Sequence, residues 1–218
     1  MSKNVFDLTE IAPNKSLHIP KIDLKNYSHI RGYHFGRPDE PESYKRHGVR
    51  VGRPAYFKER FGVIFNEFPS EILDQAIQQS DLSRNCPEQE DREVFLGLDA
   101  RPFLDRCAHY ARSGSERITD YAACLQKITG VPCLDRLKTF GVPCMVVVDV
   151  PMDEVPFESL DSLEVKLTEF AEGRYDEAYD GGEDRVDFAI SFTDNLPTEW
   201  IVAVRRLNEA GETLVLSD

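Results

Sequence analysis

Apolar and polar residues alternate along residues 28–37, and this period of two predicts a β-strand. Residues 141–151 give the clearest strand signal, because apolar residues, many of them valine, occupy both faces of the run. That pattern predicts a central strand of a sheet. Further strands are predicted from shorter apolar or alternating runs at residues 94–98, 187–192, 200–206 and 213–216, with a hairpin turn at 208–211.

Apolar residues spaced by three or four positions predict helices between these strands. The longest such pattern runs from Phe103 to Ile128, and Gly130 is placed to end it. Glycine in a helix interior costs roughly 1 kcal/mol, so residues 113–115, Ser-Gly-Ser, predict either a bend or an outside contact that holds the glycine in place. Shorter patterns predict helices at residues 42–48, 54–61, 70–79 and 156–172.

This order of elements predicts the fold class. Strands, then helices, then a terminal run of strands are typical of an α+β fold with a mainly antiparallel sheet. Residues 1–27 show no clean period and contain Pro13 and Pro20, so we expect an irregular N-terminal arm that packs across the domain. No linker and no internal repeat divides the remainder, so residues 28–218 are expected to form a single domain.

Charge is unevenly spread along the chain. The net charge of −13 argues against nonspecific binding to a nucleic-acid backbone. Residues 1–60 nevertheless carry 12 Lys and Arg against 7 Asp and Glu, which predicts a local positive field. Residues 149–187 carry 14 acidic against 3 basic residues, and this stretch is either a solvated face or a docking surface for a basic partner.

Composition sets the broad class of protein. With 218 residues, of which 41% are hydrophobic, the chain has enough apolar material for one substantial core. No apolar run approaches the roughly 18 residues that a membrane span needs, so we expect a cytoplasmic protein without a membrane partner. The five cysteines include no Cys-x-x-Cys pair, and we therefore expect reduced thiols and no structural metal.

Two segments carry candidate binding chemistry. The strand at 28–37 brings His34 and Arg37 to a turn that Gly36 makes compact. Arginine binds phosphate through two parallel hydrogen bonds and histidine can bond a ribose hydroxyl, so a phosphorylated, ribose-bearing ligand is expected. Tyr110, four residues before Gly114, is either a core residue or a stacking platform for a flat heterocycle.

Five short motifs follow one another along the chain. They are Tyr33-His34-x-x-Arg37, a helix ending at His47-Gly48, His109-Tyr110 with Gly114-Ser115-Glu116, the Gly-Val-Pro-Cys strand at 141–144, and Leu196-Pro-Thr-Glu-Trp-Ile201. No single motif is specific, but in this order they resemble the ADP-ribosyltransferase superfamily, in particular its small prokaryotic toxin and phage-defence branches.

The resemblance implies a split, mainly antiparallel β core flanked by helices. It implies NAD as the substrate, without a metal, and transfer of ADP-ribose to a protein or nucleic-acid acceptor. A toxin of this kind could also have a neutralising antitoxin as a partner. The nearest enzymatic relative of this reaction would use the same cleft for 2′-phosphate transfer to NAD.

The resemblance also implies roles for individual residues. His34 would hold the ribose and take part in catalysis, and Tyr110 would stack on nicotinamide. Arg37 would bind the pyrophosphate. Tyr33 and Ser115 complete the expected cofactor site.

The catalytic acid is where the sequence departs from the family pattern. The late strand reads Val186-Asp187-Phe188 where a glutamate is usual. Glu116 is therefore the first candidate for the catalytic carboxylate, with Asp187 and Glu183 behind it.

A binding protein, rather than an enzyme, is the alternative function that the composition also fits. The acidic stretch at 149–187 would then be the functional surface of an immunity or antitoxin-like protein that neutralises a basic partner.

Overall fold

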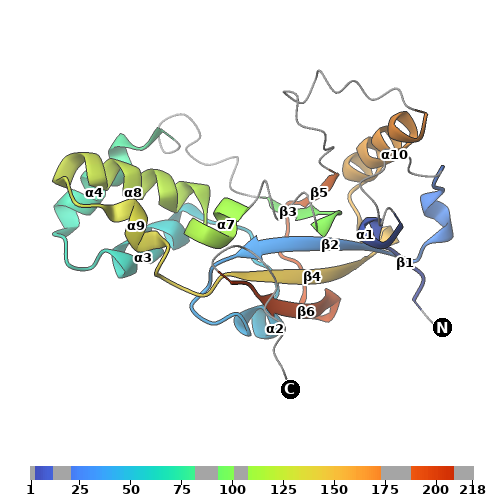
Figure 1. The fold of residues 1–218 in the computed structure, drawn as a ribbon, viewed down its shortest axis with the longest axis horizontal. Helices are drawn as coiled ribbons and strands as arrows, with labels where there is room; N and C mark the ends of the chain where they lie inside the picture. The colour runs from blue at the N-terminus through green and yellow to red at the C-terminus, as the bar shows by residue number, and fades with distance from the viewer. Residues whose placement is uncertain (1–2, 12–20, 82–92, 101–107, 173–187, 209–218) are drawn as a thin grey trace.

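The computed structural model describes residues 3–11, 21–81, 93–100, 108–172 and 188–208. A sheet occupies one part of the molecule and a lobe of helices the other (Figure 1). The strands are β1 (Val5–Phe6), β2 (His29–Gly36), β3 (Val94–Gly97), β4 (Cys144–Pro151), β5 (Ala189–Phe192) and β6 (Ile201–Arg206). The α-helices are α1 (Leu8–Ile11), α2 (Ser43–His47), α3 (Pro54–Ile64), α4 (Ser70–Gln79), α7 (Ala108–Ser113), α8 (Glu116–Thr129), α9 (Cys133–Leu137) and α10 (Phe157–Ala171). Short 3₁₀ turns are η1 (Leu24–Asn26), η3 (Met152–Glu154) and η5 (Thr198–Trp200).

Within the described ranges the sheet has six strands, and five of them lie in the order β5-β3-β2-β4-β6. Strands β2 and β4 pair antiparallel along their whole length, from His29 opposite Pro151 to Gly36 opposite Cys144. Strand β1 pairs with β2 in parallel, while the other four pairings are antiparallel. The α+β class with a mainly antiparallel sheet, predicted from the order of elements, is confirmed.

The second edge of β2 is shared by two strands. Because β4 occupies one edge completely, β1 and β3 both lie along the other. β1 pairs with His29 and Ile30, whereas β3 is joined to β2 through one register pair, Tyr33 opposite Gly97. A Cβ atom at Gly32 would lie 2.7 Å from the Cβ of Leu96, so glycine permits the close approach of β3.

The two faces of β2 are covered differently. One face, which we call the Ile30 face, carries Ile30, Gly32 and His34 and packs with the core cluster that includes Leu163 and Leu167 of α10. The opposite face, called here the Tyr33 face, carries Arg31, Tyr33 and Phe35, and α7 packs on it. Since side chains alternate along a strand, neighbouring residues of β2 lie on opposite faces.

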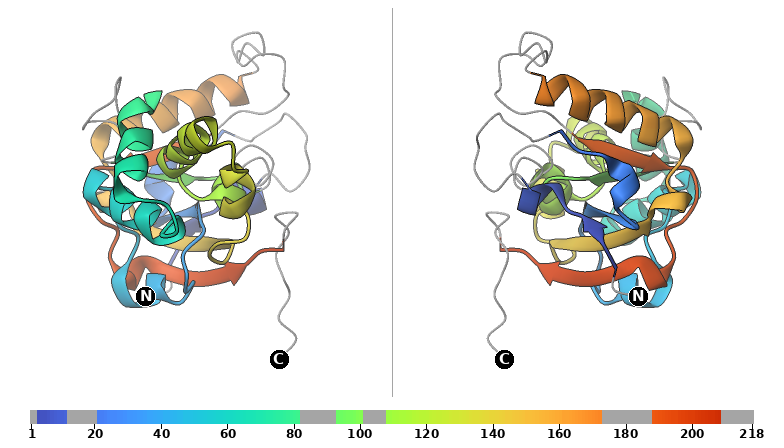
Figure 2. Two further views of the ribbon diagram at one scale, coloured as in Figure 1. Left: turned by 90° about the vertical axis from the view of Figure 1, so that its left-hand side faces the viewer. Right: turned by 90° about the vertical axis from the view of Figure 1, so that its right-hand side faces the viewer.

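The helical lobe has a core of its own. Helices α3, α4, α8 and α9 pack together around a cluster that includes Phe61, Phe65, Tyr121 and Leu125. Figure 2, left, views the molecule from the side of this lobe. Helix α8 buries residues at helical spacing, and its C-cap Gly130 adopts the left-handed conformation, with φ 73°.

The longest predicted helix is divided in two. Helix α7 ends at Ser113, Gly114 takes a positive φ of 81°, and α8 begins at Glu116. The Ser115 hydroxyl oxygen accepts a hydrogen bond from the Ile118 amide at 3.2 Å and so caps α8. A glycine that adopts positive φ, followed by a capping serine, starts a new helix more readily than it continues an old one.

The N-terminal segment is more regular than its sequence predicts. Val5–Phe6 form β1, which belongs to the sheet, and residues 8–11 form α1. The expectation of an irregular arm is therefore wrong for these residues. Residues 103–107 of the longest predicted helix and the predicted strand at 213–216 lie outside the described residues.

Candidate functional site

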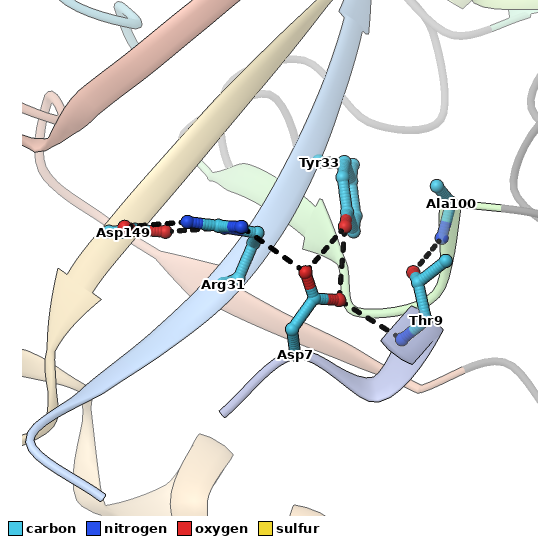
Figure 3. A network of polar contacts seen from close by, with 6 residues as sticks. All are labelled: Asp7, Thr9, Arg31, Tyr33, Ala100 and Asp149. Atoms are coloured by element: carbon cyan, nitrogen blue, oxygen red, sulfur yellow. Dashed lines mark hydrogen bonds and ion pairs between the residues drawn. The ribbon is translucent and has the colours of Figure 1, made fainter. Parts of the chain in front are cut away.

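A charged cluster lies on the Tyr33 face, where Arg31 connects two aspartates (Figure 3). Arg31 and Asp149 are cross-strand partners on β2 and β4. The guanidinium donates to both oxygens of Asp149, from Nε to Oδ1 at 2.7 Å and from Nη2 to Oδ2 at 2.9 Å. Its Nη1 donates to Oδ2 of Asp7 at 3.3 Å. Asp7 follows β1 directly, so this cluster joins three parts of the chain.

Asp7 also accepts hydrogen bonds from neutral groups. The Tyr33 hydroxyl donates to Oδ1 of Asp7 at 3.1 Å, and the Thr9 amide donates to the same oxygen at 3.1 Å. The Ala100 amide in turn donates to the Thr9 hydroxyl oxygen at 3.1 Å (Figure 3). The contacts connect α1, β2 and the segment after β3.

Burial determines the electrostatics of this cluster. Asp7 and Asp149 are 5% and 4% exposed, whereas the Arg31 side chain is 24% exposed. The hydrogen bond to Asp149 raises the pKa of Arg31, so the guanidinium stays charged. Burial, and to a smaller extent the Asp7 carboxylate, raise the pKa of Tyr33 to about 12. The phenol therefore stays a hydrogen-bond donor at neutral pH.

Of this cluster, only Tyr33 was predicted as a site residue from the sequence, whereas Arg31, Asp7 and Asp149 were not. A signal for two of them was present. Asp149 interrupts the valine-rich run of β4, and Arg31 sits between apolar positions of β2. A charged residue inside a buried strand requires a partner of opposite charge or a hydrogen-bonding group. Which residue is that partner depends on the register between the strands.

Tyr110 lies on the same face of the sheet as Tyr33. It is half-buried on α7 and packs against the apolar cluster that contains Tyr33, Phe35, Met145 and Val147. The two tyrosines of the expected cofactor site are therefore brought to one face.

Arg37 has a different environment from the expected one. Its Nε donates to the Phe140 carbonyl oxygen at 2.7 Å, and Nη1 donates to the Ala111 carbonyl oxygen at 2.9 Å. Nη2 donates to the carbonyl oxygen of Lys138. The guanidinium thus ties the end of β2 to α7 and to the segment after α9. These bonds use three of the five N–H donors that were expected to bind a pyrophosphate.

His34 lies on the Ile30 face, away from Tyr33 and Tyr110. Its Nδ1 is 3.4 Å from the carbonyl oxygen of Phe95 on β3. This contact lies next to Tyr33 and Gly97, the register pair that joins β2 to β3. Its ring meets Tyr44 edge-on at a centroid distance of 6.0 Å. Burial lowers the pKa of His34, which favours the neutral imidazole. The structure does not bring His34 together with the two tyrosines.

The other expected residues lie at the start of α8 or outside the described ranges. Ser115 uses its hydroxyl as the helix cap, as described above. Glu116 is exposed in the first turn of α8, which begins shortly after α7. Asp187 and Glu183, the further candidates for the catalytic acid, lie outside the described residues.

The described side chains and helices include neither a metal site nor a membrane span. Among the residues that the structure describes, no group of three or more His, Cys, Asp or Glu side chains is arranged to hold a metal ion. Within the same ranges, no helix combines the length and the apolar character needed to span a bilayer. Comparison of the chain with protein-family models, curated proteins and solved structures found no match.

Proposed function

We propose that the chain is an NAD-dependent ADP-ribosyltransferase of the toxin or defence type, with a protein or nucleic-acid acceptor. One observation carries the proposal: β2 and α7 bring an arginine, Arg31, and two tyrosines, Tyr33 and Tyr110, to one face of a mainly antiparallel sheet. An arginine suits a ribose or phosphate oxygen, and an aromatic ring suits the nicotinamide. The order of motifs in the sequence gives independent support.

The proposed reaction is substitution at the ribose carbon C1′. The bond between C1′ and the nicotinamide nitrogen breaks, and its electron pair leaves with nicotinamide. The acceptor nucleophile then bonds to C1′, and its proton passes to a base. Positive charge develops at C1′, so a nearby carboxylate lowers the barrier.

The geometry changes the residue assignments within this proposal. Arg31 takes the substrate-binding role first given to His34 and Arg37, because it shares a face with both tyrosines, whereas His34 faces the other way. Three of its five N–H groups bond Asp7 and Asp149, so the substrate would be bound by the other two. The buried Asp149 and Asp7 orient Arg31. Tyr110 supplies the stacking surface. The exposed Glu116 supplies the catalytic carboxylate.

The test measures nicotinamide release and label transfer from NAD that is labelled in its adenylate half. The full chain is incubated with cell extract, and we expect both products. Glu116→Gln should lower nicotinamide release at least about 100-fold with an unchanged melting temperature. Glu71→Gln is the matched control, because Glu71 is an exposed glutamate in the first turn of α4. Absence of both products with wild-type protein would rule the enzyme out.

A second candidate function is supported by the surface of α10. Phe157 and Val165 are 75% and 51% exposed on this helix, beside the exposed acids Glu158, Asp161 and Glu164. An exposed phenylalanine among carboxylates suits a partner that is basic and partly apolar. We propose the immunity-like binding protein as the alternative to the enzyme.

The alternative is tested with a Lys- and Arg-rich amphipathic peptide as the probe. Replacing Asp161 and Glu164 by lysine should weaken peptide binding at least about tenfold. The matched control replaces Glu71 and Asp74 of α4, which have the same spacing and are also exposed. If both variants lost the same amount of peptide affinity, the net charge of the chain would explain the loss. The α10 surface would then be excluded as the peptide-binding site.

A further inference from the structure

A shallow groove at the start of β2 has a mainly apolar lining, and two lysines and a histidine are among the residues that form it. Its volume is about 400 Å³, which falls in the size range of small-molecule sites. Lys3, Lys25 and His29 line it together with Tyr27. Among its described lining residues there is no carboxylate, although the chain has a net charge of −13. Two lysines with no carboxylate among the described lining residues favour an anionic ligand.

Hydrogen bonds hold the wall of this groove in place. Asn4 donates from Nδ2 to the Asn26 carbonyl oxygen at 2.6 Å. The carbonyl oxygen of Asn4 accepts from the amides of Ser28 and His29, at 2.8 and 3.2 Å. The Ser28 hydroxyl lies 2.9 Å from Nδ1 of His29 and orients the imidazole. A wall that is already ordered loses little entropy when a ligand binds.

The groove also offers an aromatic surface. Tyr27 is half-buried, and its ring meets Phe6 edge-on at a centroid distance of 5.3 Å. This contact restrains the ring, which lines the groove beside the two lysines. Ammonium groups suit phosphate oxygens, and a restrained phenol ring suits a flat base.

We propose that this groove binds a small nucleoside phosphate. Lys3 and Lys25 bind the phosphate oxygens, and Tyr27 packs against the base. His29 provides a further hydrogen bond. The inference does not depend on the proposed function, because the groove uses none of the residues assigned to NAD cleavage. The groove could bind this ligand whether the chain is the proposed enzyme or the proposed binding protein.

Calorimetric titration of the full chain with ADP tests the groove. We expect saturable binding that weakens as salt is added, because salt screens the ammonium groups. Lys3→Glu and Lys25→Glu should each weaken ADP binding at least about tenfold. Lys21→Glu is the matched control, because Lys21 is exposed and close in sequence but does not line the groove. Its effect should stay below about twofold.

Further titrations separate the parts of the ligand and locate the site. Adenosine and inorganic phosphate should each bind at least about tenfold more weakly than ADP. In NMR spectra, ADP should shift the ring signals of His29 and leave those of His34 unchanged. The proposal is overturned by the absence of saturable ADP binding, by equal effects of Lys21→Glu and Lys25→Glu, or by adenosine or phosphate binding as tightly as ADP. An unshifted His29 would exclude the groove as the ADP site.

Discussion

At the scale of single residues, the Arg31 cluster shows how charge is accommodated beside an apolar core. Two buried carboxylates face one guanidinium, so the cation alone does not balance them. The remaining acceptors of Asp7 are met by the Tyr33 hydroxyl and the Thr9 amide. Removing one of these donors leaves a buried carboxylate less well solvated, which is more costly than the loss of an exposed hydrogen bond.

We expect Tyr33→Phe to lower the free energy of unfolding by about 1–3 kcal/mol at pH 7, because a buried acceptor loses its donor. Urea unfolding followed by circular dichroism measures the change. Tyr56→Phe is the control, since Tyr56 is 55% exposed, and it should change stability by less than about 0.5 kcal/mol. Equal effects of the two substitutions would contradict the importance of the Asp7 hydrogen bond.

The difference in unfolding free energy between wild type and Tyr33→Phe should depend on pH. The pKa of Tyr33 rises from 10.0 to about 12 in the folded chain. Between these values the unfolded chain releases the phenol proton and the folded chain keeps it, so the stabilisation falls as pH rises. The stability difference between wild type and Tyr33→Phe should be full below pH 10 and shrink towards pH 12. A constant difference across this range would mean that the pKa is not raised.

At the scale of elements, hydrophobic periodicity predicted strands and helices better than it predicted their junctions. The strand pattern at 141–151 corresponds to β4, and the pattern at 70–79 corresponds to α4. The break between α7 and α8 was harder to predict, because the apolar spacing continues across Gly114. Periodicity records which residues are buried, whereas a break depends on local backbone conformation and capping.

The candidate site was less predictable than the fold, for a related reason. Alternation along β2 already places His34 and Tyr33 on opposite faces. Grouping both in one ligand site therefore conflicted with the predicted strand. The pairing of Arg31 with Asp149 depends on contacts between residues 118 positions apart, and a single sequence contains no direct record of such contacts.

Gly32 provides a test of how β3 is placed against β2. A Cβ atom at this position would meet Leu96 at 2.7 Å, so Gly32→Ala must displace the strand. We expect a loss of about 1–3 kcal/mol in unfolding free energy. Gly62→Ala is the control, since nothing lies within 4 Å of a Cβ there and the residue is inside α3. That variant should gain up to about 1 kcal/mol, so the opposite order of stabilities would contradict the close approach of β3.

At the scale of the whole molecule, the core of the sheet and the core of the helical lobe must stay joined for the chain to unfold as one unit. The sheet packs around one cluster with α10, and the lobe of α3, α4, α8 and α9 packs around another. Arg37 is one of the links between them, because its guanidinium bonds the carbonyl oxygens of Ala111, Lys138 and Phe140. A lobe with its own core unfolds separately when such links are weak.

Arg37→Ala should therefore lower stability by about 2–4 kcal/mol and separate the unfolding of the two parts. Trp200 is the single tryptophan of the chain and packs with the sheet cluster, so its fluorescence reports the sheet. Far-ultraviolet circular dichroism is dominated by the helices. The two signals should coincide in wild type, and the dichroism change should come at lower urea in the variant.

The outcome of this experiment also distinguishes the two roles considered for Arg37. Arg46→Ala, at an exposed guanidinium paired with Glu40, is the control and should leave the two signals coincident. Arg37→Lys should behave nearly as Arg37→Ala does, because one ammonium group does not reproduce the planar fork that reaches three carbonyls. If Arg37 bound a pyrophosphate instead, Arg37→Ala would weaken NAD binding and leave both transitions where they are in wild type. Separated transitions would assign Arg37 to the link between sheet and lobe.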